Sequence, residues 1–435
     1  MQTGEVSRGL WGWAVLLGLT GQLAWTVENM YLNVFVYDTI TDAPSALAGL
    51  VAASAVAATV ATLLAGAASD RVGRRREFIA GGYVLWGLCT AGFGLVQVDV
   101  AARLLPALDA VTVALVAIIV LDCVMSVLGA TANDAAFNAW VTDSTTSANR
   151  GKVDSVLATL PLLAMLLVFG ALDPLTRGGQ WQLFFLIVGG VTAGVGVIAW
   201  IGLRDSASPR PGETYLASVL HGLRPDTVRA NPRLYLALAA WAALGTSTQV
   251  FLPFLIIYVQ RYLDIDGYAI VLASVLIGAS VVSILGGRRL DRIGPSRAVV
   301  PVLGVYVVGC VAMFLARGML PVILAGIVLM SGFMFGVAAI SATVRNLTPP
   351  DRAGQVQGLR MVAMVLVPMV VGPFIGAAVI SGANETFTEL GVVKTVPTPW
   401  IFLAAALVAL LVLLPVRRLR HAQARVDEAP VELVP

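Results

Sequence analysis

Hydrophobic residues fill twelve long stretches of this 435-residue chain, and short polar segments separate them. Each stretch approaches the roughly 20 apolar residues that a helix needs to cross the hydrocarbon core of a membrane. In the first half, the predicted spans are 10–37, 46–68, 77–98, 110–141, 153–173 and 180–203. In the second half, they are 232–260, 266–286, 298–317, 319–345, 355–381 and 398–417. The pattern predicts an all-α membrane protein with twelve transmembrane helices.

A short charged signature occurs twice, at an offset of 221 residues. The stretch GAASDRVGR at 66–74 corresponds to GRRLDRIGP at 287–295, so glycine, aspartate, arginine and glycine recur at the same spacing. At the same offset, Glu28 in the first span matches Gln249 in the seventh. An internal repeat of this kind is typical of two-lobed transporters. We therefore predict two pseudo-symmetric six-helix lobes that enclose a polar site.

Composition and charge distribution refine this architecture. Hydrophobic residues make up 58% of the chain and charged residues 12%, whereas a soluble domain averages about 25% charged residues. Placing both termini on one side of the membrane puts 23 of the 28 lysines and arginines on that side. Basic residues favour the cytoplasm, so we expect cytoplasmic termini and a bacterial cytoplasmic membrane location. The predicted organisation is one lobe at 1–204, a cytoplasmic linker at 205–231, a second lobe at 232–418 and a cytoplasmic tail at 419–435.

The repeated signature carries groups suited to a conformational latch. Glycines permit tight turns and close helix approach, and an aspartate next to arginines can form and break ion pairs just outside the hydrocarbon. Aspartates have no role in setting topology, so pure topology does not explain them. The candidate latch residues are Gly66, Asp70, Arg71, Gly73, Arg74, Asp143, Asp291 and Arg292.

This pattern resembles the loop motif of the major facilitator superfamily, which lies between helices two and three and again between helices eight and nine. The resemblance covers the whole chain and implies that the loop groups hold one conformation by bonding to neighbouring helix ends. By this analogy, Asp70 would face the start of the eleventh span, and Arg71 or Arg74 would reach Asp143. The second copy departs from the first, because Pro295 and Ser296 stand where arginines are expected.

Three acidic residues lie well inside the predicted spans, all in the first half: Glu28, Asp122 and Asp134. A charge at this depth costs several kcal/mol and marks a functional site by default. Thr131, Asp134 and Asn138 share one helical face and form a polar stripe. On a regular helix, Asp122 lies about 120° from Asp134, so the two acids are not expected to face the same cavity squarely.

Other polar and aromatic residues accompany Glu28. Trp25 and Tyr31 lie one turn away on its face, and an aromatic face beside a carboxylate can hold a polyhydroxylated ring or a cation. Buried carboxylates can also carry protons. Asn33 and Gln249 are further candidates for hydrogen bonds to a solute, although each could equally bind a neighbouring helix. A purely structural hydrogen bond is the alternative for each of the acids.

A second resemblance concerns the fourth span. The stretch NDAAFNAW at 133–140 resembles the fourth-helix signature of the glycoside–pentoside–hexuronide:cation symporters, the melibiose-carrier type, and residues 69–76 are similar to sucrose–proton symporters. The resemblance implies that Asp134 binds substrate and a coupling cation. The second span has no acid where melibiose carriers use acids for sodium, so protons are favoured over sodium. The proline that follows the family's fourth-helix aspartate is also absent here.

The sequence therefore predicts a proton-coupled secondary transporter of a small polar solute, a sugar or glycoside, that works by alternating access. The alternative is a proton-coupled exporter of amphipathic compounds of the drug-efflux type, although the fifth span lacks the glycine–proline signature of that class. A receptor or scaffold without flux is a further reading. No nucleophile–base pair, metal cluster or phosphate loop indicates an enzyme. We expect no metal, no organic cofactor and no nucleic-acid partner, and a monomer in the lipid bilayer.

Overall fold

The computed structural model describes residues 7–72, 74–146, 149–204, 225–348, 358–389 and 392–419. Side chains are not described at 66–72, 151, 225, 288–291, 293, 295, 296 and 389. Within the described residues, twelve helical segments are long and apolar enough to cross a membrane. This confirms the predicted fold class. Most of the predicted linker and of the tail, 205–224 and 420–435, lies outside the described residues.

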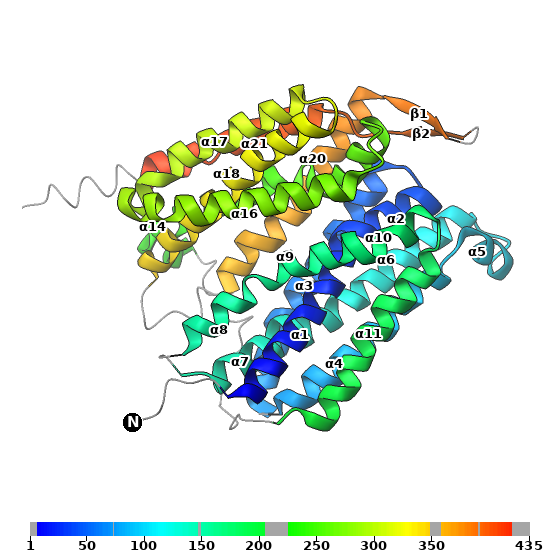
Figure 1. Cartoon of the computed structure of the whole chain (residues 1–435), viewed down its shortest axis with the longest axis horizontal. Coiled ribbons are helices and arrows are strands. Elements are labelled where there is room, and N and C mark those ends of the chain that lie inside the picture. Colours follow the sequence, from blue (N-terminus) through cyan, green and yellow to red (C-terminus); the bar gives the residue numbers. More distant parts are fainter. Residues whose placement is uncertain are drawn as a thin grey trace, which may run out of the picture.

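The first six spans lie together in one lobe, coloured blue to green in Figure 1. Several spans are composite, because π-helical or 3₁₀ turns interrupt the α-helix. In chain order the elements are α1 (Arg8–Thr26), η1 (Val27–Tyr31), α2 (Leu32–Thr39), α3 (Pro44–Val72), α4 (Arg75–Gly92), η2 (Phe93–Leu95), α5 (Val98–Leu104), α6 (Ala110–Gly129), η3 (Ala130–Phe137), α7 (Asn138–Ser144), α8 (Arg150–Leu157), α9 (Leu160–Leu167), η4 (Val168–Leu172), α10 (Asp173–Arg177) and α11 (Trp181–Gly202).

The last six spans form the other lobe, coloured green to red. Its elements are α13 (Pro225–Ala230), α14 (Pro232–Gln249), η5 (Leu252–Phe254), α15 (Leu255–Ile257), η6 (Tyr258–Tyr262), α16 (Tyr268–Ile293), α17 (Pro295–Leu315), α18 (Met319–Leu347), η8 (Val362–Leu366), α20 (Val367–Ala383), β1 (Thr386–Glu389), β2 (Val392–Thr395) and α21 (Trp400–Leu410). The strands form an antiparallel hairpin with Thr386 opposite Thr395.

Each lobe has its own apolar core, and large apolar side chains also cover much of its outer surface. In the first lobe, Phe35, Trp181, Phe184 and Phe185 interlock with ring centroids 5.1–6.1 Å apart. By contrast, residues such as Ile201 are largely exposed, at 82%. An apolar exterior around a packed interior is the pattern expected of helices that face lipid.

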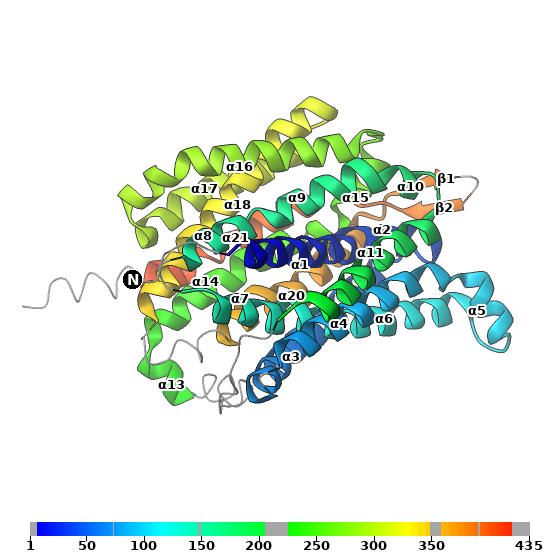
Figure 2. The same ribbon diagram turned by 60° about the horizontal axis from the view of Figure 1, so that its bottom comes forward.

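The two lobes meet mainly at one end of the molecule. We call this end, which carries β1, β2 and α5, the hairpin side, and the opposite end, where the described chain begins and ends, the terminal side (Figures 1 and 2). Across the interface α3 packs against α20, and η4 packs against α16. In Figure 1 the ribbons of the lobes diverge toward the terminal side.

Candidate functional site

Two of the three predicted intramembrane acids lie on π-helical turns. Glu28 is the second residue of η1, and Asp134 is the fifth residue of η3. A π-helix adds a residue to each turn, is rare, and is frequently found at functional sites. Around η1, the side chains of Thr26, Asn29 and Asn33 donate to backbone carbonyls four residues earlier, at 2.7, 2.8 and 3.3 Å. Such bonds bend helices and satisfy backbone groups.

The Glu28 side chain extends from the first span to the fourth span of the first lobe. Its side chain is only 8% exposed, and the Ser126 hydroxyl donates to Glu28 Oε1 at 2.6 Å. Glu28 also interacts electrostatically with Asp122 and Asp134. Because η1 packs against η5 of the other lobe, the segment that bears Glu28 lies at the interface between the lobes.

Asp122 is more deeply buried than Glu28. It is 1% exposed, and Ser54 of α3 hydrogen-bonds to it. The prediction that Asp122 and Asp134 face different directions assumed a regular α-helix between them. The π-helix η3 begins at Ala130 and breaks that regularity, and both acids interact electrostatically with Glu28.

Asp134 is surrounded by hydrogen-bond donors. Asn133 Nδ2 donates to Asp134 Oδ1 at 3.0 Å, and Trp25 provides a second side-chain hydrogen bond. The Tyr83 hydroxyl lies 3.0 Å from Asn133 Oδ1 and so orients that amide. A Cβ at Gly21 would lie 2.4 Å from Asn133 Oδ1, so a glycine is required there for the amide to fit.

The exposure of these residues differs. Asp134, Thr131 and Trp25 are partly exposed, and Asn138 is exposed and donates to the Asp134 backbone oxygen at 3.1 Å. The predicted polar stripe is therefore the accessible part of the group. Glu28 and Asp122 lie behind it. No salt bridge with a lysine or arginine reaches any of the three acids in the part of the chain that the structure describes.

Two predicted binding residues lie elsewhere. Tyr31 is fully buried and its hydroxyl donates to Asp173 at 3.0 Å, so it does not line an open face beside Glu28 as predicted. Asn33 is 1% exposed. In the other lobe, Gln249 is partly exposed and its Cβ packs against Gly372, where an added Cβ would lie only 2.5 Å away.

Asp173 is a buried acid that the sequence analysis did not select, because it stands at the predicted end of the fifth span. Its carboxylate accepts hydrogen bonds from Tyr31, from Tyr268 of the other lobe and from Arg177, the last at 2.6 Å. The guanidinium of Arg177 also lies 5.1 Å from the centre of the Tyr268 ring. These groups join the lobes near the hairpin side.

The hairpin makes a second set of contacts between the lobes. The Tyr37 hydroxyl donates to the Thr395 carbonyl at 2.7 Å, and the Thr395 amide donates to Asp42 Oδ2 at 2.5 Å. Lys394 Nζ lies 3.4 Å from the Asp38 carbonyl. The polar contacts between the lobes described here, including the ion pair of Arg261 with Asp38, lie on the hairpin side.

The predicted latch is only partly described. Gly66, Asp70 and Arg71 lie at the end of helix α3 but their side chains are outside the described set, as are Gly73 and the side chain of Asp291. Arg292 is exposed. The prediction that Arg74 reaches Asp143 is wrong. Arg75 contacts Asp143 at 3.2 Å, and Arg74 pairs with Glu77 at 3.3 Å.

Arg75 takes this place for a structural reason. It is the first residue of α4 and is 5% exposed, so its side chain points into the lobe. Arg74 precedes the helix and is exposed. The ion pair therefore depends on where α4 begins, which the sequence pattern left open.

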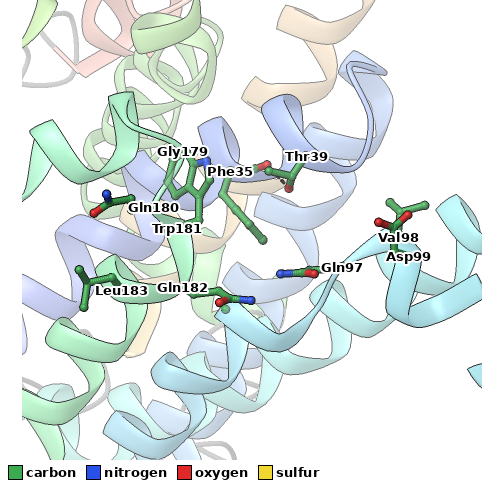
Figure 3. A pocket seen from close by; sticks show the side chains of 11 residues that line it. Phe35, Thr39, Gln97, Val98, Asp99, Gly179, Gln180, Trp181, Gln182 and Leu183 are labelled. Atoms are coloured by element: carbon green, nitrogen blue, oxygen red, sulfur yellow. Dashed lines mark hydrogen bonds between the residues drawn. The ribbon is translucent and has the colours of Figure 1, made fainter. Parts of the chain in front are cut away.

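A separate cavity of about 730 Å³ opens on the hairpin side of the first lobe. It lies between α2, the start of α5 and the start of α11, and Figure 3 shows Gln97 and Gln182 pointing toward each other across it. Phe35 and Trp181 also line it. None of the three intramembrane acids lines this cavity, so it is distinct from the acid site.

A bundle of twelve spans in two lobes, with ionisable groups at the lobe interface, is the architecture of secondary transporters. A sequence profile of the Major Facilitator Superfamily matches residues 14–369 and 242–434, so the chain belongs to this superfamily. A comparison with curated protein sequences finds no match.

Solved structures support the same fold. A variant of the nucleoside transporter NupG is 13% identical and superposes with a TM-score of 0.71, covering 94% of this chain and 99% of that protein. The xylose transporter XylE from E. coli, in a partially occluded inward-open conformation, is 14% identical with a TM-score of 0.66 over 94% and 97%. A bacterial homologue of the lysosomal transporter Spinster, inward-facing and unoccupied, is 15% identical with a TM-score of 0.65 over 97% and 96%. At these identities, the likeness shows the fold alone.

Proposed function

We propose that this protein is a secondary active transporter that moves a small polar solute, a sugar or glycoside, together with protons by alternating access. The observation that carries the proposal is the group of three interacting acids in the first lobe. The turn that bears Glu28 packs against the opposite lobe, so a change in its protonation or in its contacts acts where the lobes move relative to each other. Coupling requires such a difference in affinity between the two states.

The proposed solute class rests on the donors and acceptors around Asp134. Carboxylate, amide and indole groups meet there on a partly exposed face, and such groups fix the hydroxyls of a polyhydroxylated ring. Two structural neighbours are named as transporters of nucleosides and of xylose, and both of these solutes contain a polyhydroxylated ring. This supports a solute that contains a polyhydroxylated ring.

The direction of the molecule in the membrane is part of the proposal. Basic residues concentrate on the terminal side, which places both termini in the cytoplasm of a bacterium. The hairpin side then faces outward, and the contacts that join the lobes close the outer end of the transport path. The repeated signature, with Arg75 and Asp143, is proposed to act as the latch at the cytoplasmic end.

Transport by purified protein in liposomes tests this function. We expect an imposed pH gradient to drive accumulation of at least one compound from a panel of D-xylose, melibiose, sucrose and uridine, and a protonophore to abolish it. A lipophilic cation in the same panel reports on drug export. Glu28→Gln and Asp134→Asn should each reduce accumulation about tenfold or more, as expected for loss of a charge-assisted hydrogen bond.

Asp154→Asn serves as the matched control, because Asp154 is an exposed acid on α8. It should accumulate solute like the unmodified protein. Unchanged gradient-driven accumulation in both Glu28→Gln and Asp134→Asn would reject proton coupling through these acids. Accumulation of the lipophilic cation alone would reject the proposed solute class.

A further inference from the structure

Glu28 and Asp122 lie side by side in the first lobe. Ser126 follows Asp122 by four residues on α6, so the two side chains lie on the same face of that helix. Because Ser126 donates to Glu28 Oε1 at 2.6 Å, the Glu28 carboxyl group is held against the same face. The two acids are 8% and 1% exposed and interact electrostatically.

Each of these acids has an unsatisfied oxygen. Glu28 Oε2 and Asp122 Oδ1 are buried and have no hydrogen-bond partner within the described part of the chain. A buried acceptor left without a partner costs about 1–3 kcal/mol. An ionised carboxylate has only acceptors, whereas a protonated one also has an O–H donor. A single proton on either acid therefore adds a donor that the ionised pair lacks.

Among the described residues, no lysine or arginine forms an ion pair with Glu28 or Asp122. The ionisable groups that interact with the pair are Asp134 on η3, Cys89 on α4 and Cys123 on α6, and Ser54 of α3 contacts Asp122. Two buried carboxylates on one face of α6, without a paired cation, repel each other when both are ionised, and a proton on one of them removes that repulsion.

Asp134 has a different environment. Asn133 and Trp25 both hydrogen-bond to its carboxylate, and it is partly exposed. These contacts satisfy the Asp134 carboxylate, whereas Glu28 and Asp122 each keep a buried oxygen without a hydrogen-bond partner among the described residues. Its position on the polar stripe suits it to contact the solute.

We propose that Glu28 and Asp122 form a carboxyl pair that shares one proton, and that this pair, not Asp134, carries the coupling proton. The proton adds to a carboxylate oxygen from water and leaves to water as the lobes rearrange. The role in coupling rests on the proposed function, whereas the shared proton itself does not. Asp122 therefore becomes a proton-site residue, although it lies too deep to touch the solute in this conformation.

Infrared spectroscopy of the full chain in lipid nanodiscs tests the shared proton without any substrate. At neutral pH, we expect one band from the C=O stretch of a protonated carboxyl group, identified by its shift on exchange into D₂O. Glu28→Gln and Asp122→Asn should each move this band to higher frequency, because an amide oxygen accepts more weakly than a carboxylate. The double variant should lose the band, and Asp134→Asn and Asp154→Asn should leave it unchanged.

Several results would overturn the proposal: loss of the band in Asp134→Asn, its persistence in the double variant, or an unchanged frequency in both single variants. If the double variant does not fold, the single variants decide the question. In liposomes, Asp122→Asn should keep solute exchange and lose gradient-driven accumulation. If the unmodified protein transports none of the panel, the proposed function fails while the spectra still report on the pair.

Discussion

Asp38 and Arg261 form an ion pair that joins the two lobes at the hairpin side. An Arg261 guanidinium nitrogen donates to Asp38 Oδ1 at 3.0 Å, and the two side chains are 18% and 21% exposed. The same guanidinium lies 5.7 Å from the centre of the Phe387 ring on the hairpin. Arg261 stands on the π-helix η6, so a non-α turn positions this contact as well.

Removing this ion pair should shift the molecule toward a state that is open on the hairpin side. A partly buried hydrogen bond between charged groups contributes about 1.5–3 kcal/mol, so Arg261→Gln should change the ratio of states about tenfold or more. Spin labels at Gln97 and Asp266, which are exposed on different lobes, would report the distance between them, with Cys89, Cys123 and Cys310 replaced by alanine. Restoration of the original distance by the exchange Asp38→Arg with Arg261→Asp would confirm the pairing, and an unchanged distance in Arg261→Gln would refute it.

Two tyrosines, Tyr31 and Tyr268, donate to the Asp173 carboxylate, and substituting each in turn separates a contact within one lobe from a contact between the lobes. Tyr31 belongs to the same lobe as Asp173 and Tyr268 to the other. Tyr268→Phe should therefore lengthen the distance between the labels, whereas Tyr31→Phe should only lower the thermal unfolding midpoint. Each substitution removes one hydrogen bond, worth about 1.5–3 kcal/mol to a charged acceptor. Equal shifts of the distance in the two variants would show that Asp173 does not act as a contact between the lobes.

Hydrophobicity alone was sufficient to place the twelve spans, because each span is recognised by the summed hydrophobicity of about 20 residues. The predicted second span, 46–68, and the observed span Pro44–Ala65 differ by only a few residues. The short helix α5, Val98–Leu104, was not predicted. It lies in the predicted loop between the third and fourth spans, where seven residues give no periodic signal strong enough to identify a helix.

The candidate site was less predictable than the spans. Glu28, Asp122 and Asp134 stand out in the sequence because charges inside a span are rare. Glu28 and Asp134 lie on π turns, which follow from tertiary packing and not from residue spacing. Asp173 was missed because residues at the end of a span are ordinarily solvated, whereas here Tyr268 of the other lobe covers it.

The ion pair between Arg75 and Asp143 should stabilise the first lobe. Their side chains are 6% and 11% exposed, and removing one partner of a buried pair costs about 3–5 kcal/mol. Arg75→Ala should therefore lower the thermal unfolding midpoint clearly. Arg74→Ala is the matched control, because its pair with Glu77 is 66% and 43% exposed and contributes about 1 kcal/mol at most. A larger loss in Arg74→Ala would contradict this assignment.

Asp109 should make stability depend on pH near the start of the fourth span. The hydroxyl and then the backbone N–H of Thr112 donate to its carboxylate at 2.7 and 2.8 Å, and they hold its pKa below the ordinary value. A lowered pKa in the folded state adds stability above the unfolded value, and that stability is lost as pH falls through the folded pKa.

The thermal unfolding midpoint of Asp109→Ala, measured against the unmodified protein, checks this dependence. The difference should be present at neutral pH and should shrink at a pH of about 3 or below, where the carboxyl group becomes protonated in both states. Asp154→Ala controls for loss of an exposed acid that does not begin a helix. A difference that stays constant with pH would show that the charge of Asp109 is not involved.

Gly87 should be essential for the packing of α4 against α11. A Cβ at this position would lie 2.3 Å from the Ala193 nitrogen and 2.4 Å from the Gly189 oxygen. Both are backbone atoms and cannot move aside without separating the helices, so Gly87→Ala should destabilise the lobe by about 1–3 kcal/mol. This loss exceeds the gain of up to about 1 kcal/mol that alanine gives a helix. Gly190→Ala is the matched control, because a Cβ there meets nothing within 4 Å, and it should leave the thermal unfolding midpoint unchanged or raise it. If Gly87→Ala also raised the midpoint, the two helices would not pack as closely as the structure shows.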